Sequence, residues 1–177
     1  QKFEVITPFD INGRSKQPDI KNPSQLETTD IPALPPFPAI TKLVLPPAML
    51  FQLRQSLFPA ERMVVGAARK TDGIVEVEAL FDVTGAANAV GVKADPNLLA
   101  QALIAMAETE TYFGIWIHSH PGLGAGATHP SGIDLNQHAD WLRDYSADLV
   151  SAIMVKDGYV RFWGKAIESR EITVRIE

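Results

Sequence analysis

Proline is distributed very unevenly along the 177 residues of this chain, and its placement limits where helices and central strands can form. Nine of the thirteen prolines lie within residues 1–47, and four of these fall in the segment 31–38. Because each proline fixes φ and removes a backbone hydrogen-bond donor, this part cannot form a long helix or a central strand. We expect residues 1–39 to be a Pro-rich N-terminal arm or linker, with at most a short strand at Phe3–Thr7.

Residues 40–177 have the hydrophobic patterning of one folded domain of the α+β class. Proline and capping signals predict three helices, and short apolar runs predict the strands. Tight turns at Asp72-Gly73 and Asp157-Gly158 are expected to close two hairpins. The predicted architecture is a mixed β-sheet flanked by helices, with helices at 46–57, 95–106 and 131–144 and strands at 40–45, 62–68, 74–83, 89–93, 112–117, 149–155, 159–163 and 172–176.

The composition of the chain indicates which binding partners and which cellular compartment to expect. The net charge of -5, without a basic stripe, argues against affinity for nucleic acid or for an anionic membrane surface. No apolar run is long enough to cross a bilayer. Cysteine is absent, which excludes disulfides and cysteine-ligated metals and is typical of a cytoplasmic protein. We expect a cytoplasmic protein that binds neither nucleic acid nor membranes.

The residues most suggestive of chemistry follow an apolar run. This run ends in His118 and His120, and a loop then leads to Asp134. Side chains two residues apart on a strand point to the same face, so the two imidazoles should lie side by side. Pro121 should end the strand there and open the pair to a cleft. Two imidazoles and one carboxylate suit zinc and leave the fourth tetrahedral position for water. We therefore predict a zinc site formed by His118, His120 and Asp134.

Other interpretations of the same residues remain open. Ser131 and Asp134 also match a helix-capping pattern, with Ser131 as the N-cap and Asp134 in the first turn. His138 lies one turn beyond Asp134 on the same helix face, which makes it a rival for the third ligand position. We expect His138 and His129 to lie outside the ligand set, and Ser131 to cap the helix and also serve the site.

These residues resemble the signature of the JAMM metalloproteases, the MPN+ or JAB-domain family. That signature is a glutamate upstream of His-Ser/Thr-His, then seven residues, then Ser-x-x-Asp. His118-Ser119-His120 and Ser131-Gly132-Ile133-Asp134 match it, but the gap at 121–130 has ten residues. The resemblance covers residues 40–163 and implies an MPN/JAB-like fold. It also implies that His118, His120 and Asp134 hold Zn²⁺ and that Ser131 supports the oxyanion.

The upstream glutamate of the signature has three candidates. Glu61 lies between the first predicted helix and an apolar strand, which is where the family places its glutamate. Glu76 and Glu78 alternate with valines on a later strand, as expected of its solvated face. We assign Glu61 as the general base, with Glu76 or Glu78 as alternatives.

The resemblance implies zinc-dependent hydrolysis of amide or isopeptide bonds, with a ubiquitin-like protein or its conjugate as substrate. It further suggests an E1-like or E2-like protein of the same system as a partner. Two alternatives are a non-catalytic MPN scaffold subunit and a hydrolase of small peptide or amino-acid conjugates of a sulfur-carrier protein. The Gly-rich loop at 121–128 is expected to be mobile without substrate and to order as an added strand against an extended tail.

Overall fold

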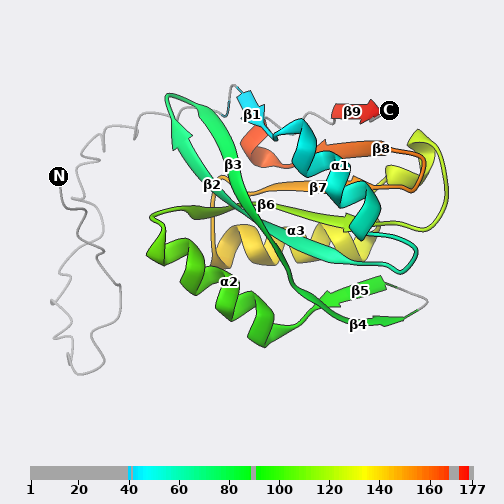
Figure 1. Cartoon of the computed structure of the whole chain (residues 1–177), viewed down its shortest axis with the longest axis horizontal. Coiled ribbons are helices and arrows are strands. Elements are labelled where there is room, and N and C mark those ends of the chain that lie inside the picture. Colours follow the sequence, from blue (N-terminus) through cyan, green and yellow to red (C-terminus); the bar gives the residue numbers. More distant parts are fainter. Residues whose placement is uncertain (1–39, 41, 89–90, 168–171, 176–177) are drawn as a thin grey trace, which may run out of the picture. The chain divides into compact units, whose positions relative to one another are not determined.

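A computed structural model describes residues 40, 42–88, 91–167 and 172–175 (Figure 1). The predicted arm at 1–39, including the strand at Phe3–Thr7, lies outside the described residues. Among the described residues, no helix combines the length and the apolar character that a membrane crossing requires. The described part is an α+β fold, as the sequence predicts.

Seven strands form one mixed sheet with the order β1-β3-β2-β6-β7-β8-β9. The central strands β6 and β7 are parallel, β2 is antiparallel to β6, and β8 is antiparallel to β7. A separate antiparallel pair is formed by β4 and β5. The strands are β1 (Lys42–Val44), β2 (Met63–Thr71), β3 (Ile74–Asp82), β4 (Thr84–Asn88), β5 (Gly91–Ala94), β6 (Tyr112–Ser119), β7 (Val150–Met154), β8 (Tyr159–Trp163) and β9 (Ile172–Arg175).

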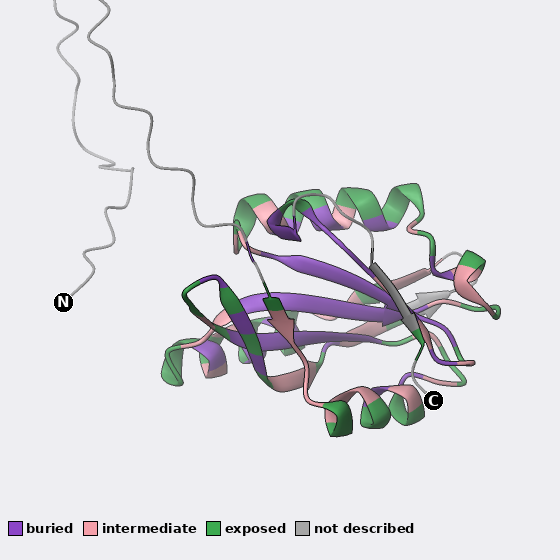
Figure 2. Cartoon of the chain, turned by 90° about the horizontal axis from the view of Figure 1, so that it is seen from above, coloured by how far each residue is buried: buried purple, intermediate pink, exposed green. Residues whose placement is uncertain are grey.

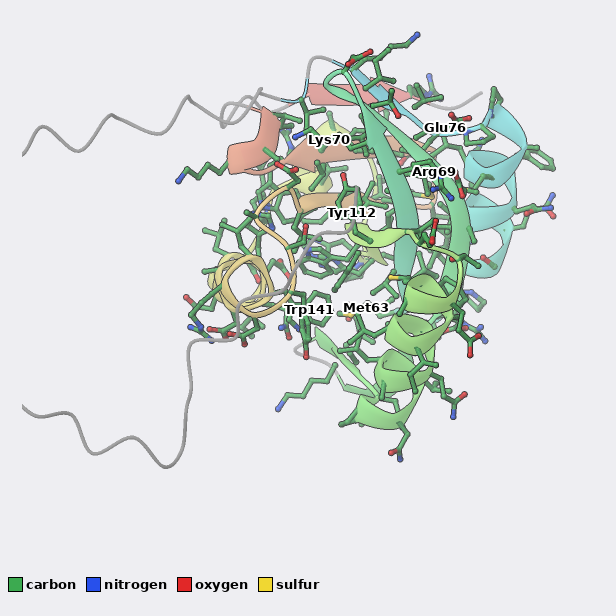
Figure 3. The ribbon with its side chains drawn as sticks, turned by 90° about the vertical axis from the view of Figure 1, so that its left-hand side faces the viewer. Met63, Arg69, Lys70, Glu76, Tyr112 and Trp141 are labelled. Carbon is green, nitrogen blue, oxygen red and sulfur yellow. The ribbon has the colours of Figure 1, made fainter. Side chains whose placement is uncertain are left out.

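Helices cover both faces of the large sheet. Helix α1 (Pro47–Ser56) packs through Leu53 on one face, in a core that includes Ile115 and Ile117 of β6. Helices α2 (Pro96–Glu108) and α3 (Gly132–Asp144) contribute to a second core on the other face. Figure 3 shows α1 and α3 on opposite sides of β2 and β3. The strands are largely buried between helices whose outer sides are exposed (Figure 2).

All three predicted helices are confirmed, and local chemistry explains their starts. The Asp95 side chain caps α2 by accepting from two backbone amides, and Ser131 forms a capping box with Asp134 at the start of α3. The two predicted hairpins are also confirmed. At the first, Asp72 and Gly73 have φ values of 51° and 79°, the left-handed backbone that two-residue turns favour.

Strand β4 was not predicted, because its sequence TGAAN has few residues that favour strands. Tertiary contacts hold it instead. The Thr84 hydroxyl accepts from the backbone amide of Met63 at 3.0 Å, which ties the start of β4 to β2. A Cβ on Gly85 would lie only 2.7 Å from the carbonyl oxygen of Lys93, so the close approach of the two strands requires glycine.

The loop between β6 and α3 also differs from the expectation. Rather than an open Gly-rich segment, it contains the 3₁₀ helix η2 (Ala125–Thr128), and Thr128 is fully buried. The Gly124 amide donates to both carboxylate oxygens of Asp157, at 3.0 and 2.9 Å. These contacts come from the β7–β8 hairpin, far away in sequence, so the loop's own residues do not reveal them.

Candidate metal centre

Strand β6 delivers two histidines to the end of the central sheet. His118 is 3% exposed and lies in β6 between Met63 of β2 and Ile153 of β7. His120 follows the last residue of the strand, and its side chain is 19% exposed. The Nε2 atoms of the two rings lie 3.0 Å apart. The histidine pair therefore has one buried member and one that faces the opening of the site.

The first turn of α3 brings the predicted carboxylate to this pair. Asp134 Oδ1 lies 2.9 Å from His118 Nε2, and Asp134 Oδ2 lies 3.2 Å from His120 Nε2. The Ser131 amide also donates to Asp134 Oδ2, at 2.7 Å. The three residues that the sequence predicts as zinc ligands therefore meet at one point.

The donor set and spacing fit a zinc ion. In a tetrahedral site with ligand distances of about 2.0–2.1 Å, the ligand atoms are separated by about 3.3 Å. The observed separations of 2.9, 3.0 and 3.2 Å are slightly shorter, so small outward shifts accommodate the ion. Within the described residues, His118, His120 and Asp134 are the one group of histidine and acidic side chains that converges in this way.

Each imidazole is oriented by a different contact. The Nδ1 atom of His120 lies 3.1 Å from the carbonyl oxygen of Ala127 in η2. A carbonyl can only accept, so Nδ1 carries the proton and Nε2 keeps its lone pair for a metal. His118 instead stacks on Trp116, with ring centroids 4.8 Å apart and planes 8° from parallel. Trp116, which is buried in the core, therefore also positions a ligand.

Electrostatics favour the ligating forms of two of the three residues. Burial lowers the pKa of His118, which keeps its imidazole neutral. Burial opposes ionisation of Asp134, but hydrogen bonds with His118 and His120 outweigh it and hold the pKa of Asp134 well below its usual range. At His120 the same balance raises the pKa, because the Asp134 carboxylate outweighs the effect of burial. Binding of a metal at His120 therefore competes with a proton.

The backbone pairing around Arg62 and Ser119 bears on the position of Glu61. The Arg62 amide donates to Ser119 Oγ at 2.9 Å, and the Ser119 amide donates to the Arg62 carbonyl at 3.0 Å. This pairing puts Glu61, one residue earlier, next to His120. Consistent with this position, the negative charge of Glu61 makes a small contribution that favours the protonated form of both imidazoles, while burial still lowers the pKa of His118.

The alternative glutamates lie elsewhere. Glu76 is paired with Arg69 in the sheet, and Glu78 forms an ion pair with the same arginine at 2.8 Å. Arg69 is six residues along β2 from Met63, the residue opposite His118, which corresponds to about 20 Å of strand. Figure 3 shows Met63 and Glu76 well separated. Neither Glu76 nor Glu78 can reach the histidines from there.

The two remaining histidines lie outside the ligand group. His138 is buried under α3, where Nδ1 makes a short hydrogen bond with Ser151 Oγ of β7. His129 is exposed, and its Nε2 lies 3.3 Å from Arg161. His138 thus lies outside the ligand group, as expected, but it is buried between α3 and the sheet rather than at the surface. No sequence signal marks its partner Ser151, thirteen residues away.

A groove of about 540 Å³ begins at Asp134 and runs toward β5. Its apolar floor includes Trp116 and Trp141, and residues 92–94 of β5 form one wall. Ile133, 56% exposed, borders it on the α3 side. Within the described residues β5 is hydrogen-bonded in a sheet only to β4. The groove is therefore lined both by residues of β5 and by Asp134 of the candidate metal centre.

No protein-family model matches this chain, and a search of curated proteins finds no significant match.

Proposed function

We propose that this chain is a JAMM-type zinc hydrolase of the MPN/JAB-like fold that cleaves amide or isopeptide bonds to a ubiquitin-like protein. The observation that carries the proposal is the convergence of His118, His120 and Asp134 at the end of a groove. Glu61, just before β2, and Ser131, which caps α3 beside Asp134, are close to the same group. Metal ligands, a carboxylate base and a hydroxyl donor beside a groove form the set that hydrolysis of an amide requires.

His118, His120 and Asp134 would hold the ion. Zinc, when bound, supplies a Lewis acid and lowers the pKa of water to about 7. Glu61 accepts a proton from the attacking water and returns it to the departing amine as the C–N bond breaks, which leaves a carboxylate and an amine as products. The proton leaves the water on one side of the carbonyl and reaches the amine on the other, which requires a base near His120. The register between Arg62 and Ser119 supports Glu61 in this role.

Ser131 can stabilise the oxyanion without giving up its role as a cap. Its Oγ accepts from the Asp134 amide at 3.3 Å. A hydroxyl has one donor as well as acceptor lone pairs. The Ser131 hydroxyl hydrogen-bonds to the Asp134 carboxylate, and its proton would turn from there to the oxyanion that develops on the substrate carbonyl. Ser131 is exposed, so a substrate can reach it.

The groove favours an extended substrate tail. A peptide lying along β5 would satisfy the open backbone groups of that edge by β-augmentation, with its side chains over the apolar floor. The scissile bond would then reach Asp134 and its neighbours at the end of the groove. A flexible carboxyl-terminal tail of a folded modifier has this shape, and the modifier itself would add contact area outside the groove.

The test compares three substrates with one scissile linkage to a fluorescent amine: ubiquitin, a ubiquitin-like sulfur-carrier protein and the isolated tail peptide. Zinc-loaded protein should cleave a folded substrate with a higher kcat/KM than the peptide, and a chelator should abolish cleavage. Equal values for the carrier protein and the peptide would favour the hydrolase of small conjugates. Zinc binding without cleavage of any substrate would favour the non-catalytic scaffold and contradict the proposal.

A further inference from the structure

The loop between the two halves of the candidate metal centre is held by the β7–β8 hairpin. Arg161 of β8 donates from Nε to Thr128 Oγ1 at 3.0 Å and from Nη2 to the carbonyl of Ala125 at 3.3 Å. Thr128 in turn donates to the same carbonyl at 2.6 Å. One guanidinium and one buried hydroxyl thus fix the first and last residues of η2.

The residue between them faces the metal centre. Ala127, inside η2, presents its carbonyl oxygen to His120 Nδ1 at 3.1 Å. Partners of this kind fix the tautomer and the ring orientation of metal-ligating histidines. The position of this carbonyl depends on the conformation of η2, because Ala127 contributes its backbone and not a side chain that could adjust.

We propose that Arg161 is a positioning residue for His120: by holding η2 it places the Ala127 carbonyl, which orients the imidazole toward the metal. Arg161 contacts Thr128 and the carbonyl of Ala125, so its effect on His120 passes through these two residues and the backbone of η2. The inference rests on the proposed zinc site. It assigns a role to the lengthened loop, which carries a partner for a ligand of the site.

The geometry of the guanidinium matters to this role. Its planar fork reaches two acceptors of η2 at once, and Nη2 also lies 3.3 Å from His129 Nε2. A lysine has a compact ammonium on a flexible stem and cannot reproduce two fixed directions. Arg161→Lys should therefore keep only part of the zinc affinity that Arg161→Ala loses. Full zinc affinity in Arg161→Lys would show that the positive charge alone is sufficient.

The experiment measures the zinc dissociation constant of the full chain by competition with a chromophoric chelator. Arg161→Ala should weaken zinc binding by about 10–100-fold, the usual effect of losing an outer partner of a ligand. Thr128→Val keeps Arg161 but removes the hydroxyl that accepts from it, and should also weaken zinc binding. Arg175→Ala on the neighbouring strand is the matched control, since Arg175 packs over Tyr159 and should leave zinc affinity unchanged.

Two further readouts separate positioning from general destabilisation. Metal-free Arg161→Ala and Arg175→Ala should show similar circular dichroism, and the visible spectrum of the Co²⁺-substituted protein should change only in Arg161→Ala and Thr128→Val. If Arg161→Ala does not fold, Thr128→Val decides. Unchanged zinc affinity in a folded Arg161→Ala, or in Thr128→Val, would overturn the positioning role alone. Failure of the wild-type chain to bind zinc would refute the metal site and the proposed function with it.

Discussion

Arg62 and Ser119 exchange two hydrogen bonds across β2 and β6, from the Arg62 amide to Ser119 Oγ and from the Ser119 amide to the Arg62 carbonyl. These bonds fix the register at the place where β6 ends and β2 begins. The residue before Arg62 is Glu61 and the residue after Ser119 is His120, so in an antiparallel pair they become neighbours. A local backbone contact thus brings the proposed base to a metal ligand.

This register makes a specific prediction for Glu61→Gln. The substitution keeps the shape of the side chain but removes its ability to accept a proton. The variant should retain zinc and lose about 10²–10⁴-fold in kcat, the usual contribution of general-base catalysis. Glu76→Gln and Glu78→Gln are the controls and should stay within a few-fold of wild type. An inactive Glu76 or Glu78 variant beside an active Glu61→Gln would show that the base is misassigned.

Ser131→Ala should separate two roles in one measurement series. Loss of the N-cap should lower the free energy of unfolding by about 0.5–2 kcal/mol, measured by urea titration of the metal-free protein. Loss of an oxyanion donor should lower kcat by about 10²–10³-fold in the zinc-loaded protein. Zinc affinity should remain, since the Asp134 carboxylate is untouched. A stability loss with unchanged kcat would leave Ser131 as a cap only.

His138→Ala should destabilise the domain without removing the metal. The substitution leaves Ser151, which is fully buried, without the imidazole that it contacts. An unsatisfied buried hydroxyl costs about 1–3 kcal/mol, so the urea midpoint should fall. His129→Ala, at an exposed position of the same residue type, should have a much smaller effect. Equal stability of the two variants would contradict this account of His138.

Deletion of residues 1–39 should leave a folded protein that binds zinc. Proline-dense segments contribute little packed core, and the described core begins at Ile40, which is 3% exposed. Circular dichroism and zinc content of the 40–177 chain test this expectation. An unfolded or insoluble product would show that the arm contributes to the stability of the domain.

The sequence predicted those features that local chemistry determines. Helix starts at Asp95 and Ser131, the turn at Asp72-Gly73 and the alternation of His118 and His120 each depend on a few adjacent residues. The resemblance to the JAMM signature favoured Asp134 over His138 as the third ligand. The structure brings Asp134 to the histidine pair. The ligand group could therefore be named before any coordinates.

What the sequence could not predict depends on contacts between distant segments. Arg161 lies 33 residues from Thr128, and Asp157 lies 33 residues from Gly124, so neither pair has a local pattern. A Gly-rich loop was accordingly expected to be mobile, although its contacts to the hairpin give it a defined 3₁₀ turn. Strand β4 was missed for the same reason, since pairing with β5 outweighs the low strand propensity of its residues.

The zinc content of the purified 177-residue chain and of three variants tests the central claim most directly. Wild type and His138→Ala should each carry about one zinc per chain, as expected for a three-ligand catalytic site, and Asp134→Ala should carry almost none. Ser131→Ala, which removes the same cap but keeps the carboxylate, controls for damage to the start of α3. A wild-type chain without zinc, or full occupancy in Asp134→Ala together with loss in His138→Ala, would contradict the assignment of the metal centre.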